Sequence, residues 1–425
     1  MATVKRMRMT TNEVDVHRDQ REHVYDEAET EEAEQMDESR GPLEESGCTH
    51  DGESEEEVEE CVAEDMERFE QSFRNITQRY KLINRIGEGT FSTVYKAEDL
   101  LTPAQAETAL CRHQKIYVTS SPMRIFNELE LLYDLRDSPN VCPLITAFRH
   151  QDQVIAVLPY FQHRDFREYF RDMPIPEMRY YFTSLFTAVA AVHEKRIIHR
   201  DIKPTNFLYS PGSRRGVLVD FGLAEREGTD WYACNCSYDP EDRRRRIQHS
   251  AYAKTKAHHR AMDRDAPIMY PKEDQRHSRR ANRAGTRGFR APEVLLKCTA
   301  QTCSIDVWSA DDIDAFIELC TIFGKRRMQE CASLHGQVLQ TTIPTISEGG
   351  HSWEKILLWC TNRNKKEQGG GLTAEETEAV EFMRCCLELD PAKRITANDA
   401  LRHPFLQIRE GDDEEDGMDR GSQEK

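Results

Sequence analysis

The chain has 425 residues and a formal net charge of −18. Its mean hydropathy is −0.74, no apolar run approaches bilayer length, and no apolar leader follows MATVKRMRMT, so we expect neither a membrane-spanning nor a secreted protein. The 13 cysteines are scattered through apolar patterns without disulfide-like spacing, which favours reduced thiols in an intracellular protein.

The negative charge is concentrated at the two ends of the chain. Residues 1–70 hold 25 acidic and 7 basic residues, and residues 409–425 hold 8 acidic and 3 basic ones. Segments such as ESEEEVEECVAED cannot bury enough apolar surface to offset the entropy of ordering. We therefore predict an acidic disordered tail at residues 1–75, either a solvated spacer or a docking segment, and an acidic C-terminal tail at residues 409–425.

Ordered structure is expected from about residue 80. YKLINRIGEGTFSTVYKAEDL indicates a strand, a glycine turn and a second strand, and SSPMRIFNELELLYDL has the apolar spacing of a helix behind a Ser-Pro start. DQVIAVLPYF indicates another strand, and a helical period dominates from EMRYYFTSLF onward. This order predicts an α+β fold with a small β-rich lobe at 80–160, a larger helical lobe at 161–405, and a cleft between them.

The IGEGTFSTV stretch places glycines in a tight turn between two strands. Glycines there allow backbone N–H groups to approach a polyphosphate, although glycines in a hairpin are more often only a turn. The third glycine of the usual loop is replaced by Ser92. The candidate ATP contacts here and at the end of the later strand are Ile86, Gly87, Gly89, Val94, Pro159 and Phe161.

A more specific pattern is IIHRDIKPTNFLY, which matches the catalytic loop of protein kinases. Asp201 would orient the attacking hydroxyl and accept its proton, and Lys203 would lie near the transferring phosphoryl group. Asn206 would bind Mg²⁺ through its amide oxygen. The KPTN form of this loop is typical of serine/threonine kinases.

Two further motifs follow in the order that a kinase requires. Asp220 in GVLVDFGLAE is the expected second Mg²⁺ ligand, and APE at Ala291–Glu293 closes the activation segment. Thr286 is placed to bind the catalytic aspartate and lysine, and Arg394 to form a salt bridge with Glu293. The three motifs together predict a protein-kinase domain that uses ATP and Mg²⁺.

The lysine that clamps the ATP phosphates is harder to place. The usual V-A-I-K strand corresponds to ETALCRHQKIYV, where Lys115 is the nearest candidate and Arg112 and His113 intrude. Its acidic partner on the next helix is expected to be Glu128 rather than Glu130.

Four blocks resemble the catalytic subunit of DDK, the cell-division-cycle serine/threonine kinase that fires DNA replication origins, in its fungal form. They are KIYVTSSPMRIFNELELL, DQVIAVLPYF, HRDIKPTNFLYSPGSRRGVLVDFGLAE and RRANRAGTRGFRAPEVLLKC. The resemblance extends from about Tyr80 to Phe405. It implies a nuclear kinase that needs a Dbf-type regulatory subunit, phosphorylates the MCM helicase and prefers Ser or Thr beside acidic or phosphorylated residues. Neither membrane association nor direct sequence-specific nucleic-acid binding is expected. The same blocks argue against a casein-kinase type.

Members of this family carry insertions within the kinase domain, and the resemblance implies one here at about residues 228–284. Residues 226–290 contain 16 Lys and Arg against 9 Asp and Glu, including the run Arg243–Arg246. Positive charge in an activation segment would attract acidic or phosphorylated substrates. A solvated disordered insert and a nuclear import signal are the alternatives.

The insert begins with the cysteine pair Cys234 and Cys236. In the family an insert can bind zinc, which requires four thiolate or imidazole ligands. His249, His258 and His259 are further candidates, but no second cysteine pair follows in the insert. Free thiols are therefore the favoured interpretation, and zinc is the weaker one.

The resemblance breaks after Ser309. TCSIDVWS begins like the central helix of the helical lobe, with Asp306 and Trp308 in their expected places, but DDIDAFIEL, which resembles the next helix, follows at once. A splice or exon-boundary variant is the leading explanation, and a repacked but active domain is the second. The alternative to an active enzyme is a catalytically impaired scaffold that binds a regulatory subunit.

Overall fold

The structure is a computed structural model. It describes residues 59–73, 76–88, 92–102, 110–116, 121–150, 153–229, 233–249, 253, 285–286, 289–308, 314–337, 339, 343–361, 363, 371–409 and 412. Most of the two predicted acidic tails and much of the predicted insert lie outside these ranges. No helix within them is long and apolar enough to cross a membrane.

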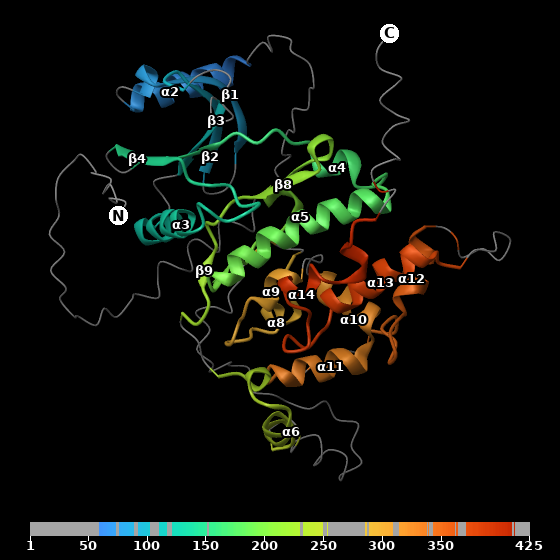
Figure 1. Ribbon diagram of the computed structural model, residues 1–425. Coiled ribbons are helices and arrows are strands. Elements are labelled where there is room, and N and C mark those ends of the chain that lie inside the picture. Colours follow the sequence, from blue (N-terminus) through green and yellow to red (C-terminus); the bar gives the residue numbers. More distant parts are fainter. Residues whose placement is uncertain are drawn as a thin grey trace, which may run out of the picture. The chain divides into compact units, whose positions relative to one another are not determined.

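Five antiparallel strands and one helix form the small lobe (Figure 1), as the pattern of residues 80–160 predicted. Along the sheet the order is β1-β2-β3-β5-β4. The strands are β1 Tyr80–Glu88, β2 Ser92–Asp99, β3 Leu110–Ile116, β4 Thr146–His150 and β5 Gln153–Pro159. Helix α3, Pro122–Asp134, begins with a proline in its first turn, where the missing N–H leaves no hydrogen bond unmade.

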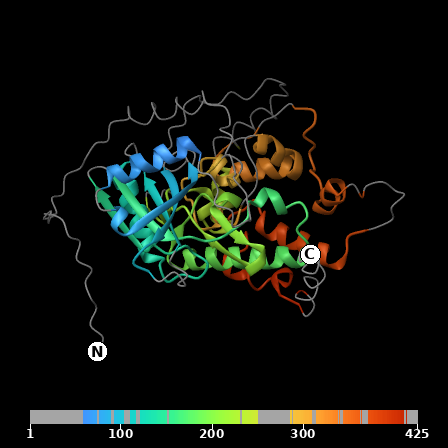
Figure 2. The ribbon, with the colours of Figure 1, turned by 90° about the horizontal axis from the view of Figure 1, so that it is seen from above.

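An additional helix, α2 Glu60–Ser72, covers the outer face of this sheet (Figure 2). Phe69 is fully buried and its ring stacks on Tyr95 at 4.8 Å, while Asp65 accepts a 2.6 Å hydrogen bond from the Tyr95 hydroxyl. The prediction of disorder across residues 1–75 is therefore wrong for residues 60–72. The missed signal is the helical spacing of Val62, Phe69 and Phe73, which is a narrow apolar stripe among acidic residues.

Strand register gives the two faces of the sheet different surroundings. Tyr95, His113 and Val157 are register partners on the face covered by α2. Val94, Gln114 and Ala156 are register partners on the opposite face, where Ala156 joins the large core shared with the helical lobe. Since successive side chains of a strand alternate, even-numbered residues of β3 face the helical lobe.

The helical lobe is built around the long helix α5, Ile175–Glu194, which packs against the β7–β8 hairpin and α14 (Figure 1). Two small two-stranded sheets, β6–β9 and β7–β8, flank the catalytic loop. Their strands are β6 Ile197–Ile198, β7 Phe207–Ser210, β8 Arg215–Leu218 and β9 Glu225–Arg226. The other helices are α4 Phe166–Tyr169, α6 Pro240–Gln248, α8 Pro292–Leu295, α9 Ser304–Val307, α10 Asp314–Phe323, α11 Lys325–Leu334, α12 Trp353–Cys360, α13 Ala374–Cys386 and α14 Ala397–Ala400.

The start of the predicted C-terminal tail is part of the fold. The fully buried Arg179 of α5 forms ion pairs with Asp412 at 2.8 Å and with Glu375 at 2.7 Å. Arg409 pairs with Glu375 and Glu378 of α13. A tail that begins at residue 409 is therefore wrong, because the buried guanidinium of Arg179 needs the Asp412 carboxylate as its partner.

The predicted break at Ser309 lies just after a four-residue helix. Helix α9 ends at Val307 after one turn, and the next described helix, α10, begins at Asp314. Trp308 is buried and its ring lies 6.0 Å from that of Phe323 on α10. Its indole Nε1 has no hydrogen-bond partner among the described residues. Helix α10 thus closes the core around Trp308, which corresponds to the alternative of a repacked domain.

Candidate active site

Asp201 lies at the centre of a hydrogen-bonded catalytic loop. Its Oδ1 accepts bonds of 2.6 Å from both the backbone N–H and the hydroxyl of Thr286. Its Oδ2 accepts a 3.0 Å bond from Asn206 and lies 3.3 Å from Lys203 Nζ. Lys203 Nζ also donates to Thr286 Oγ1 at 2.6 Å. The structure therefore brings these four predicted residues together, because the 3₁₀ turn Pro204–Asn206 folds the amide back onto the carboxylate.

The charge state of Asp201 follows from this arrangement. Burial raises the pKa of its carboxyl group, but the Lys203 ammonium and the hydrogen bonds from Thr286 outweigh that effect. The pKa of Asp201 is consequently below its ordinary value. The residue is a carboxylate at neutral pH and can accept a hydrogen bond from a substrate hydroxyl.

Asp306 holds the catalytic loop in place; the sequence predicted its position but no role for it. Asp306 accepts 2.8 Å bonds from the backbone N–H groups of His199 and Arg200, and it lies 2.9 Å from His193 Nε2. Both loop amides therefore have partners although they are buried beside the catalytic residue. Only the tertiary structure reveals this role, since a backbone amide leaves no mark in the sequence.

Asp220 directly follows a backbone segment that is hydrogen-bonded to Asn206. Val219 donates a 2.9 Å backbone bond to the Asn206 carbonyl, which aligns the two segments. Asp220 has a φ of 63°, a conformation that is strained for a non-glycine residue, and its side chain is exposed. The Asn206 amide nitrogen is bound to Asp201, so its oxygen remains for a cation. An amide and a carboxylate oxygen are ligands that Mg²⁺ prefers.

Glu128 of α3 reaches the same place from the small lobe. A Cβ on Gly222 would lie 3.2 Å from Asp220 Oδ1 and 3.6 Å from Glu128 Oε2, so the two carboxylates flank Gly222. Burial, together with the negative charge of Asp220, raises the pKa of Glu128 to about 7. Its Oε1 accepts a 3.4 Å hydrogen bond from Gln114. Glu128 is thus positioned as predicted, but its described partner on β3 is a neutral amide.

The assignment of Lys115 as the phosphate-clamping lysine is wrong. Lys115 is the register partner of Thr93 and Ile155 on the face covered by α2, and its Nζ lies 5.5 Å from the ring centroid of Phe69. Gln114 occupies the position that faces Glu128. A shift of one residue along a strand moves a side chain to the opposite face, and the sequence alone did not fix that parity.

The other candidate ATP contacts lie on the β1–β2 hairpin and at the end of β5. Gly87 pairs with Val94 in the β1–β2 hairpin; Val94 is buried and Ile86 is exposed. Pro159 ends β5, and Phe161 packs against the large core. Gly89 lies outside the described residues. The roles of these residues in binding ATP stay predictions.

The predicted salt bridge between Arg394 and Glu293 is present. Two charged hydrogen bonds of 2.6 and 2.9 Å join the groups, both of which are buried. Arg394 also donates to the carbonyls of Ser304 and Glu388. Because every donor group has a partner, this pair ties the end of the activation segment to the helical lobe.

The basic run begins on α6 and is partly used within the fold. Arg243 forms a largely buried 2.6 Å ion pair with Asp390 and donates a 2.7 Å bond to the Cys236 carbonyl. The Arg246 guanidinium lies 3.7 Å from the ring centroid of Tyr238. These two arginines anchor the helix, so a substrate-attracting role for the whole run Arg243–Arg246 is too broad.

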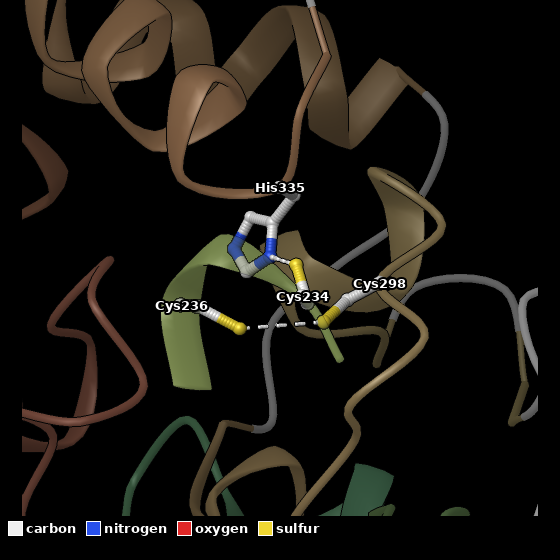
Figure 3. A group of neighbouring side chains, drawn as sticks. All are labelled: Cys234, Cys236, Cys298 and His335. Atoms are coloured by element: carbon white, nitrogen blue, oxygen red, sulfur yellow. Dashed lines mark hydrogen bonds between the residues drawn. The ribbon is translucent and has the colours of Figure 1, made fainter. Parts of the chain in front are cut away.

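A buried group of soft ligands lies where the insert meets the helical lobe: Cys234, Cys236, Cys298 and His335 (Figure 3). Their ligand atoms all lie within 4.8 Å of one another. Cys234 Sγ is 3.7 Å from His335 Nδ1, and Cys236 Sγ is 3.5 Å from Cys298 Sγ. Ligands on a tetrahedral zinc ion with bonds of about 2.3 Å lie about 3.8 Å apart, so the set fits this ion.

The expectation of an incomplete ligand set is therefore wrong. The missing ligands were sought within the insert, whereas Cys298 follows α8 and His335 follows α11. His249 is directed elsewhere, since its Nδ1 lies 2.7 Å from the Arg245 carbonyl. His258 and His259 lie outside the described residues.

Comparison with known proteins decides the family. The protein kinase domain pattern matches residues 80–237 and 270–406. The cell cycle serine/threonine-protein kinase hsk1 of Schizosaccharomyces pombe is 40% identical over 413 residues, covering 84% of this chain and 79% of the relative. The chain belongs to this family of cell-cycle serine/threonine protein kinases. The cell cycle protein kinase spo4 of the same yeast is 37% identical over 385 residues, covering 79% of this chain and 87% of the relative. The probable cell division control protein 7 homolog 2 of Encephalitozoon cuniculi is 36% identical over 350 residues, with 78% and 93% covered.

This membership confirms the predicted bilobal fold and serine/threonine kinase activity, and it agrees with the resemblance to DDK catalytic subunits. Kinases of this fold use ATP with Mg²⁺, and the ion would supply positive charge that stabilises the phosphate groups. Asn206 and Asp220 are the residues that would hold the ion. Asp201 is the carboxylate that would orient the hydroxyl of the substrate and take its proton.

Proposed function

We propose that this kinase acts in the nucleus with a Dbf-type regulatory subunit and phosphorylates subunits of the MCM helicase at the initiation of DNA replication. The hydrogen-bonded set of Asp201, Lys203, Asn206 and Thr286 supports an active phosphotransferase rather than an impaired scaffold. The resemblance to DDK catalytic subunits supports the partner, the substrate and the compartment.

An exposed apolar stripe on α3 supports the need for a regulatory subunit. Met123, Phe126 and Tyr133 are 71%, 62% and 55% exposed, and their spacing places them along one side of the helix. Ile125 and Glu128 are on the buried side of the same helix. A partner that covers the stripe would bury three large apolar side chains and hold Glu128 at the active site.

The partner is tested by co-expressing the chain with a Dbf-type subunit and measuring co-purification and phosphorylation of an MCM N-terminal fragment. Phe126→Glu should abolish co-purification, whereas Trp359→Glu, at a 70% exposed position on α12, should not. Equal retention of the subunit by both variants would exclude α3 as its docking surface. No phosphorylation of the fragment by the parent complex, despite activity on a generic acidic peptide, would exclude the proposed substrate.

We also propose that the acidic preference of the family depends here on Arg244 and Arg245, two exposed arginines of α6; Arg246 is exposed as well, but its guanidinium lies over the ring of Tyr238. Peptides with Asp, Glu or phosphoserine after the target residue should be preferred, less so as salt rises. Replacing both arginines with Ser should reduce this preference more than the rate on a neutral peptide. An unchanged preference would leave the run as a solvated insert or an import signal.

A second proposal concerns the cysteine–histidine cluster, whose four buried ligands favour a structural zinc ion that joins the insert to the helical lobe. Metal analysis of the purified chain should give about one zinc ion per chain, since four protein ligands close the coordination sphere. Cys298→Ser should lose the metal and lower the melting temperature. Cys360→Ser, at an exposed position, is the matched control. A parent chain without zinc when prepared in its presence would contradict the site.

A further inference from the structure

The inner face of β3 carries an arginine next to the position from which the family's lysine is missing. Gln114 faces Glu128, and Arg112, two residues earlier, is on the same face. Lys115 is on the opposite face against α2. The one other cation on this face of β2 and β3 among the described residues is Lys96, whose Nζ lies 4.8 Å from the ring centroid of Tyr160.

The surroundings of Arg112 direct its charge toward the active site. Burial lowers the pKa of Arg112, and the nearby groups that oppose this effect are Cys142, Asp220 and Glu128. His163 follows β5, its Nδ1 lies 3.0 Å from the Phe161 carbonyl, and its pKa is lowered by burial, so it adds no positive charge at neutral pH. Arg112 is thus on the face of β3 that Glu128 approaches, and Asp220 and Glu128 are among the negative groups that act on it. Its guanidinium stays charged, because arginine does not lose its proton in proteins.

The hydrogen bonds of Arg112 are incomplete without a ligand. Its Nε is buried and has no partner among the described residues. A buried charged donor without an acceptor is unfavourable, and an ATP phosphate oxygen would be the natural acceptor beside Asp220. The planar guanidinium can also hold phosphate through two donors, which an ammonium cannot.

We propose that Arg112 supplies the positive charge that binds the ATP phosphates on strand β3, in place of the lysine that faces the α3 glutamate in other kinases. Gln114 then serves only to hold Glu128. This inference rests on the kinase activity of the family and is independent of the MCM substrate and the Dbf-type partner.

Direct binding of Mg·ATP and of adenosine to the purified chain, measured by calorimetry, tests the proposal. Arg112→Gln should weaken Mg·ATP binding at least tenfold and change adenosine binding less than twofold, because only the phosphates lose a contact. Arg112→Lys should retain most of the affinity. Lys96→Gln removes one positive charge from the same face and should change Mg·ATP binding less than twofold.

Two results would overturn the proposal. Tighter Mg·ATP binding by Arg112→Gln would show that the arginine fills the nucleotide site instead of serving it. Equal weakening of ATP and adenosine binding in a chain that melts at the parent temperature would show a structural role. If Arg112→Gln does not fold, Arg112→Ala combined with Gln114→Lys decides: recovered Mg·ATP binding supports the proposal, and a folded chain without it refutes the proposal. Kinase activity of the complex with the regulatory subunit is a separate measurement. Failure of the Arg112 proposal can therefore be distinguished from failure of the proposed function.

Discussion

The two sides of the nucleotide site differ in how completely their charges are paired. On the helical-lobe side, Asp201 is bound by Asn206 and Thr286 and lies against Lys203. On the small-lobe side, Glu128 has a 3.4 Å bond from an uncharged glutamine and lies near another carboxylate. Asp201 is thus paired within the protein, whereas no cation forms an ion pair with Glu128 among the described residues.

The geometry of the two sides depends on residues that are separated by different distances along the chain. Asp201, Lys203 and Asn206 lie within six residues, so a short motif carries most of the geometry of the helical-lobe side, and Thr286 comes from a second motif. The small-lobe side joins a strand to a helix through the parity of β3, and one inserted residue changes which side chain faces the site. The kinase motif therefore predicted the residues of the catalytic loop correctly, whereas the motif of β3 led to the wrong lysine.

The largest effect on kcat is expected on the helical-lobe side of the site, at Asp201. Asp201→Asn should lower kcat by about 10²–10⁴-fold while ATP affinity changes less than about twofold, because only the proton acceptor is lost. Single-turnover phosphorylation and nucleotide binding separate the two quantities. Asp137→Asn, at a carboxylate that is 87% exposed, is the control. A rate near that of the parent would remove Asp201 from the chemistry.

The support beneath the catalytic loop is the next test. Asp306→Ala leaves the His199 and Arg200 amides without their acceptor, which costs about 1–3 kcal/mol for each buried group. Urea unfolding should report this loss, and kcat should fall with it. Asp137→Ala, whose side chain is 87% exposed, should leave both values unchanged. Full stability in the Asp306 variant would mean that the loop is held by other contacts.

On the small-lobe side, the buried Glu128 predicts that the stability of the protein depends on pH. The pKa of Glu128 is about 7 in the folded protein against 4.5 for the unconstrained group, so the folded state binds the proton more tightly. This group therefore lowers stability as pH rises from about 4.5 to 7, by up to about 3 kcal/mol above that range. Glu128→Gln should raise the melting temperature at pH 8 and change it little at pH 5.

The exposed neighbour on the same helix provides the control for this test. Glu130→Gln should shift the melting temperature equally at both pH values, because Glu130 is exposed on α3. A stabilisation by Glu128→Gln that is greater at pH 5 than at pH 8 would reverse the sign of the argument. It would show that a positive charge already neutralises Glu128 in the ligand-free protein.

The smallest effect is expected at the lysine that the sequence favoured. Lys115→Ala should change the KM for ATP by less than about twofold, because its side chain lies on the face of the sheet opposite Gln114 and Glu128. Its side chain contacts Phe69 on the far face of the sheet. A tenfold rise in KM without a loss of stability would require β3 to rotate by one residue when ATP binds.

The sequence by itself determined the bilobal fold, the catalytic loop and the family. Those conclusions rest on motifs whose groups are close together in the chain, or on the periods of strands and helices. The contact between Glu293 and Arg394 was also predicted, since both residues lie in recognisable kinase segments. The other predictions depended on which helices and strands pack against one another.

Only the tertiary structure decided that α2 is ordered, that Lys115 faces away from the site and that Cys298 and His335 join the insert cysteines. The acidic segment is ordered as a helix because the sheet buries Phe69 and Phe73. The sequence of the segment does not show that this sheet lies against it. The cysteine cluster gathers ligands separated by about a hundred residues, because the start of the insert, the end of α8 and the end of α11 pack together. Local patterns carry no information on such contacts, since they are set by burial of surface between distant segments.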